Sequence, residues 1–149
     1  MKIITQKKIT QEELNEKVRL HRLWLENHRD GEKLDLSYAN LSGLGLSYVN
    51  LSYVNLSYAN LTDVDFTDSN LFNTIGNNKE IKTIQFETYT VVLYKDIIQI
   101  GCEQHTYNKW DNFTYRELEK MAYDAPGWWR KHKEIVLQLS RLHQKEMEI

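Results

Sequence analysis

The sequence predicts a mainly β protein with flanking helices, built around a short solenoid. The first observation is a five-residue repeat that runs without interruption over residues 34–73. A helix repeats near 3.6 residues and a strand repeats at 2, so a strict period of five fits neither. The chain must instead turn a corner every five residues, so that two residues of each unit point inward and neighbouring coils pair through their backbones.

The second observation is the composition of the two inward positions. The centre of every unit is Leu or Phe, and the residue two positions earlier is Ala, Val or Leu except in the last unit, where it is Ser69. We therefore expect these two positions to form the core of the solenoid. The central residues are Leu36, Leu41, Leu46, Leu51, Leu56, Leu61, Phe66 and Leu71.

The third observation is the residue that precedes each centre. It is Asn or Asp in every unit but one, where it is Gly45; these residues are Asp35, Asn40, Asn50, Asn55, Asn60, Asp65 and Asn70. The segment resembles the pentapeptide-repeat family, in which a small residue is followed by Asn or Asp, then Leu or Phe, then two freer positions. The resemblance implies a right-handed quadrilateral β-helix with twenty residues per coil, so residues 34–73 would form two regular coils.

Two coils cannot close their own ends, because both ends would expose unpaired strand edges and apolar layers. We therefore expect the flanking segments to be caps. The predicted organisation is an N-terminal helical cap over residues 1–33, the β-helix over 34–75, and a C-terminal module of β-strands and two helices over 76–149.

The N-terminal cap is predicted to begin with a short extended arm over residues 3–9. Thr10 and Glu13 then have the spacing of a capping box, which opens a helix from about residue 11 to about residue 28. Leu14, Val18, His21 and Leu25 follow the spacing of one helical face. The segment resembles the amino-terminal cap that precedes the repeats in many small members of the family.

The C-terminal module begins where the rhythm fails. Residues 81–86, 89–94 and 97–100 are rich in Ile, Val, Thr and Tyr and are predicted to be strands that continue the sheet over the last coil. Thr114 and Glu117 form a second capping box, and Pro126 lies in the first turn of a last helix. The module resembles one found in small phage and prophage members of the family, which implies phage origin and no assigned reaction. The residues that carry this resemblance are Ile75-Gly76-Asn77, Ile100-Gly101-Cys102, His105, Trp110, Met121 and Trp128-Trp129.

Composition limits the class of protein. The chain has 149 residues, a net charge of −2 and one cysteine, Cys102. One cysteine allows no internal disulfide, and no apolar run suits a signal peptide or membrane span, so we expect a cytoplasmic protein with no membrane partner. The net charge argues against direct nucleic-acid binding. Residues 34–73 carry four Asp and no Lys or Arg, but this acidic surface is too short and too weakly charged to mimic DNA well.

The first candidate site is a set of outward tyrosines. The fifth position of each unit points away from the core, and Tyr38, Tyr48, Tyr53 and Tyr58 occupy it. Exposed tyrosines favour a protein-binding surface, because each offers a large contact area at low entropic cost. The alternative is that the flanking helices pack over these rings.

The second candidate site is a nucleotide pocket in the C-terminal module. Trp128 and Trp129 lie beside Arg130 and Lys131, a combination that suits stacking on bases and bonding to phosphates, and His105 and Trp110 could complete the pocket. The alternative is that the tryptophans are core residues and the basic residues form the wet face of the helix.

Catalytic and metal-binding motifs are not found in the sequence. Cys102 and His105 have a spacing that suits two metal ligands, but zinc requires four ligands, or three and a water. A Cys–His nucleophile pair would lack a third group to orient it. We therefore expect no catalytic residue, no metal and no cofactor, with a buried thiol and a hydrogen-bonded histidine as the simplest interpretation.

These observations predict a non-catalytic binding protein. The leading hypothesis is a phage or mobile-element protein that binds a host protein in the host cytoplasm and blocks a host or defence activity. The first alternative is a binder or sponge of nucleotide signals, and the second is a DNA-mimicking topoisomerase inhibitor. A homodimer is compatible with each of the three.

Overall fold

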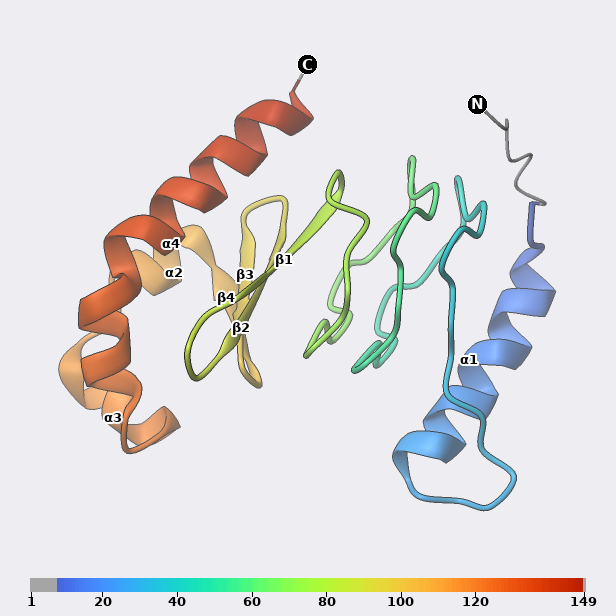
Figure 1. Cartoon of the computed structure of the whole chain (residues 1–149), viewed down its shortest axis with the longest axis horizontal. Helices are drawn as coiled ribbons and strands as arrows, with labels where there is room; N and C mark the ends of the chain where they lie inside the picture. The colour runs from blue at the N-terminus through green and yellow to red at the C-terminus, as the bar shows by residue number, and fades with distance from the viewer. Residues whose placement is uncertain (1–7, 149) are drawn as a thin grey trace.

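The computed structural model describes residues 8–148. Its parts follow one another along the long axis of the molecule in chain order (Figure 1): helix α1, the solenoid coils, a four-stranded sheet, and helices α2 to α4 on the far side of that sheet. The solenoid therefore lies between two caps.

Helix α1 (Gln11–Leu25) covers the first coil. The capping box is confirmed, since the Thr10 hydroxyl accepts from Glu13 N and the Glu13 carboxylate accepts from Thr10 N. The helix ends three residues earlier than predicted. Leu14 is fully buried in the solenoid core. Of the predicted extended arm, Lys8 forms a parallel bridge with Asn40, and residues 3–7 lie outside the described residues.

The repeats form a solenoid in which parallel bridges join residues twenty apart. These pairs are Asp35 with Asn55, Asn40 with Asn60, Gly45 with Asp65, Asn50 with Asn70 and Asn55 with Ile75. The eight central Leu and Phe residues are each at most 2 % exposed, so the predicted inward orientation is observed. The handedness and four-sided cross-section of the coil stay predictions.

The sheet consists of β1 (Ile81–Gln85), β2 (Thr90–Tyr94), β3 (Ile97–Ile100) and β4 (Glu103–Thr106), antiparallel and in that order. The strands were predicted to continue the sheet of the coils. They instead form a separate antiparallel sheet that covers the last coil through side chains. Tyr94 meets the Phe66 ring edge-on at 5.2 Å. The buried Gln99 side chain accepts from Leu71 N at 2.7 Å, which satisfies a backbone group at the open end of the solenoid.

The other face of the sheet packs against three helices, not the two that were predicted. They are α2 (Tyr107–Asp111), α3 (Tyr115–Met121) and α4 (Ala125–Met147). The capping box of α3 and the proline in the first turn of α4 are confirmed. Strand β4 and helix α2 were not predicted. This side has its own apolar cluster, which includes Leu93, Ile98 and Val136.

Candidate functional site

The turn that repeats every five residues explains why the tyrosines point outward. In the first unit the Leu36 carbonyl accepts from Ala39 N at 3.1 Å, and Tyr38 has a φ of 61°, as at the third position of a type II turn. The Asn or Asp of each unit stabilises the turn that follows: Asn40 Oδ1 accepts from Ser42 N at 3.2 Å and from Ser42 Oγ at 2.9 Å. Every fifth position of the repeat has a positive φ, including Gly43.

All four predicted tyrosines are exposed. The exposed fraction is 50 % for Tyr38, 77 % for Tyr48, 42 % for Tyr53 and 69 % for Tyr58. The caps therefore do not bury them. Trp24 of helix α1 contacts the Tyr53 ring, with the ring centroids 6.1 Å apart. Within the described residues, no other ring of α1 contacts one of the four tyrosines.

The tyrosines do not form one face. Tyr38 and Tyr58 are twenty residues apart and stack with ring centroids 4.9 Å apart and planes at 14°. Tyr53 instead meets Phe72 edge-on at 5.5 Å. Tyr48 is ten residues, half a coil, from both members of the stacked pair, so it lies on the other side of the solenoid. The tyrosines therefore fall into the stacked Tyr38–Tyr58 pair, a run of rings from Trp24 through Tyr53 to Phe72, and Tyr48 by itself on the far side.

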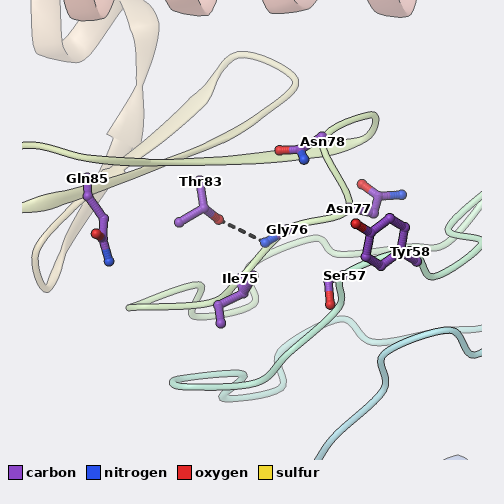
Figure 2. Close-up of a pocket in the computed structure, with 8 residues that line it drawn as sticks. All are labelled: Ser57, Tyr58, Ile75, Gly76, Asn77, Asn78, Thr83 and Gln85. Atoms are coloured by element: carbon purple, nitrogen blue, oxygen red, sulfur yellow. Dashed lines mark hydrogen bonds between the residues drawn. The ribbon is translucent and has the colours of Figure 1, made fainter.

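A groove of about 470 Å³ lies next to this pair. One side is Ser57 and Tyr58, and the other is Thr83 and Gln85 of β1, with residues 75–78 between them (Figure 2). Gly76 N donates to Thr83 Oγ1 at 2.9 Å, and Thr83 Oγ1 donates to the Thr74 carbonyl at 2.6 Å. These bonds hold the edge of the sheet against the end of the solenoid.

Gly76 is required at this junction. A Cβ atom there would lie 2.1 Å from the Ile81 carbonyl oxygen, so no other residue fits without moving the backbone. Sequence reasoning missed the groove because its two sides are more than twenty residues apart. The available signal was the failure of the repeat at Ile75-Gly76, where Ile75 nevertheless still pairs with Asn55.

Two of the four aspartates of the repeat belong to the turns. Hydrogen bonds from Ser37 and Thr67 hold the pKa values of Asp35 and Asp65 below their ordinary range. These carboxylates are thus ionised parts of the backbone turns, which leaves Asp63 and Asp68 at outward corner positions.

The predicted nucleotide pocket is not assembled as expected. Trp110, Trp128 and Trp129 are brought together, but all three are buried in the apolar cluster between sheet and helices. The cavity that they line measures about 60 Å³, far below the roughly 300–1,000 Å³ of sites for drug-sized ligands. Arg130 is exposed, and Lys131 forms an ion pair with Glu87 at 3.2 Å. This region matches the alternative interpretation, in which the tryptophans are core residues and the basic residues form the solvent-exposed face of the helix.

Cys102 and His105 do not contact each other in the way a nucleophile pair would. His105 Nε2 lies 2.9 Å from Glu103 Oε2, and its ring packs on Trp110 and Phe113. The expectation of a buried thiol was wrong, because Cys102 is exposed. Within residues 8–148, no group of three or more His, Cys, Asp or Glu side chains is placed to hold a metal ion. No helix in the same range is long and apolar enough to span a bilayer.

The turn, the Asn or Asp bond and the twenty-residue pairing define a repeat-solenoid protein with a cap at each end. Residues 35–73 match the family described as pentapeptide repeats, in eight copies. This segment, about a quarter of the chain, therefore consists of pentapeptide repeats. Comparison with the curated proteins and with the solved structures gives no match.

Proposed function

We propose that the chain is a non-catalytic binding protein, encoded by a phage or mobile element, that blocks a host or defence activity by binding a host protein in the host cytoplasm. Pentapeptide-repeat proteins often bind other proteins or mimic DNA. The observation that carries the proposal is the exposed Tyr38–Tyr58 stack beside the groove at the end of the solenoid.

The backbone at these tyrosines strengthens the proposal. A non-glycine residue in the left-handed region costs roughly 1–2 kcal/mol, and glycine avoids that cost. Gly43 occupies the same turn position, so the fold accepts the relaxed residue there. Tyr38 and Tyr58 nevertheless hold large rings in the costly conformation and in water.

The test is affinity capture from host lysate with the partner identified and its affinity then measured. Tyr38→Asn and Tyr58→Asn remove the rings but keep a residue that tolerates the turn, as Asn73 does at the equivalent position. We expect each to weaken binding by about tenfold, the effect of losing about 1.4 kcal/mol of contact. Tyr48→Asn, on the other side of the solenoid, is the matched control and should leave the affinity unchanged. Equal losses in all three variants would contradict the proposal.

A DNA-mimicking topoisomerase inhibitor is the second candidate, and it rests on the family match alone, because four Asp on residues 34–73 are too few to resemble duplex DNA. Its test is a gyrase supercoiling assay with excess protein, in which unchanged activity would eliminate it. Self-association is compatible with both candidates. Ile135 and Leu142 are exposed one heptad apart on α4, and light scattering would detect a dimer formed there.

A further inference from the structure

We propose that the groove beside Tyr58 binds an extended segment of the partner protein, which adds to the sheet as a fifth strand along β1. The inference rests on the proposed protein-binding function and names the form in which the partner is bound. The starting observation is the strand order β1-β2-β3-β4, which leaves one side of β1 without a neighbouring strand among residues 8–148. The residues of β1 are mostly half-exposed, whereas those of β2 are mostly buried.

The hydrogen-bond pattern of the hairpin shows which backbone groups face that free side. Phe86 N donates to the Tyr89 carbonyl at 3.1 Å and closes the β1–β2 hairpin. Because paired residues alternate between bonded and non-bonded in an antiparallel ladder, Ile84 and Lys82 bond to β2. Thr83 and Gln85 therefore direct their backbone N–H and C=O groups away from β2.

Two further bonds agree with this assignment. The Thr90 carbonyl, opposite Gln85, accepts from Gly101 N at 3.3 Å and so faces β3 rather than β1. The Ile81 carbonyl, two residues before Thr83, accepts from Asn78 N at 2.9 Å, outside the sheet. The free edge therefore starts after Ile81 and consists of the backbone groups of Thr83 and Gln85. The same two residues line the groove.

The chemistry of the groove selects an uncharged extended strand. None of its eight lining residues is charged, and the β1 residues with free backbone groups are Thr83 and Gln85. Proteins commonly protect a free edge with a charge or a proline, and this edge has neither at those positions. Lys82 is paired with Glu146 of α4 and lies on the opposite strand face. Tyr58 and Ile75, both exposed, offer apolar contact to alternate side chains of the incoming strand.

Strand β4, at the other edge, is a poorer site. It carries Glu103 and His105, which bond to each other, and it continues directly into α2. The Gln104 side chain is already used, since it donates to the Ser69 carbonyl at 2.8 Å. The proposal is therefore specific to β1.

The test uses a displayed library of short peptides, selected on the full chain, with the enriched peptides then synthesised as probes. Gln85→Pro removes one outward N–H without removing a ladder bond, and proline is tolerated at such edge positions. We expect it to weaken binding of the probes by about tenfold, while Gln85→Ala, which keeps the N–H, changes it by less than about twofold. Methylation of alternate amides in the probe should cause a loss as large as Gln85→Pro does.

Hydrogen exchange supplies a readout that does not depend on the variants. The amides of Thr83 and Gln85 should exchange fast in the free protein and slow in the complex, while those of Lys82 and Ile84 are protected in both. Failure to enrich any peptide, enriched peptides that bind Gln85→Pro as well as wild type, or unchanged exchange at Thr83 and Gln85 would overturn the inference. A host partner that is lost with Tyr58→Asn but retained by Gln85→Pro would overturn the inference alone and leave the proposed function standing.

Discussion

His21 joins helix α1 to the solenoid, and replacing it with Phe should loosen this cap. The imidazole is fully buried, with Leu34 N donating to Nδ1 at 3.0 Å. Nε2 therefore carries the hydrogen and donates to the Ser52 carbonyl at 3.0 Å. Phe keeps a ring that can stack on Trp24, which lies 5.5 Å away, but it removes both hydrogen bonds.

The expected loss follows from the two groups that are left without a partner. An unsatisfied buried donor or acceptor costs about 1–3 kcal/mol, so the Leu34 N–H and the Ser52 carbonyl together predict a loss of roughly 2–6 kcal/mol. This is a large part of the roughly 5–15 kcal/mol by which domains are stable.

The same variant should change the pH dependence of stability. Burial lowers the pKa of His21, and of His143 on α4, below the ordinary value of about 6.5. Below that pH the unfolded chain binds protons that the folded chain does not. The contribution of these two histidines to the free energy of unfolding is therefore fully present above about pH 6.5 and is lost as the pH falls below it. Each histidine adds a slope of at most about 1.4 kcal/mol per pH unit.

Chemical denaturation at several pH values between neutral and mildly acid measures both effects. We expect His21→Phe to be less stable at neutral pH and to have a shallower pH slope than wild type. His28→Phe, at an exposed histidine just beyond the same helix, is the control for the change to Phe and should keep most of the wild-type stability at neutral pH. A His21→Phe protein with the stability and slope of wild type would refute the assignment of His21 as a buried neutral link.

Three other predictions test the core and the junctions. Leu51→Lys should leave the chain largely unfolded by circular dichroism, because a fully buried leucine is replaced by an unpaired charge, and an unchanged thermal midpoint would show that the inward assignment is wrong. Gly31→Ala should cost more than about 3 kcal/mol in denaturant unfolding, since its Cβ would lie 2.2 Å from Trp24 N; a loss below about 1 kcal/mol would contradict this contact. The hydrogen bond to Asp124 raises the pKa of Tyr89 to about 12, so its contribution to stability is present below pH 10 and is lost as the pH rises toward 12. Asp124→Asn should lower that pKa in an ultraviolet titration, and an unchanged midpoint would contradict the assignment.

The parts of the fold that the sequence predicts well are those with a strict period or a local signal. The five-residue repeat predicted the inward residues, and both capping boxes predicted where helices begin. Strand β4 gave no such signal, because Glu103–Thr106 lacks apolar alternation. It is held in part by a distant contact, from the Gln104 side chain to the Ser69 carbonyl.

The candidate site was predictable only in part for a similar reason. The fifth position of the repeat identifies outward tyrosines, but their exposure depends on where the caps pack, which no local pattern reports. Trp128 and Trp129 are neighbours on one helix, and both are buried because α4 packs against the sheet and also against α2 and α3, so a wide arc of the helix is covered. The sequence pattern predicted one apolar stripe along this helix, and such a stripe does not indicate that two adjacent residues are both buried.

The bonds that join the caps to the solenoid also fix how its length can change. His21 meets the coil at Ser52 and Gln99 meets it at Leu71, each at a set point on the circumference. Inserting one unit of five residues would keep the local turns but rotate one cap relative to the other by a quarter of the twenty-residue period. Inserting four units would restore the original alignment, and a copied coil with tyrosine at that corner would add a third ring to the Tyr38–Tyr58 stack. Growth of this protein by duplication is thus compatible with its caps only in steps of a whole coil.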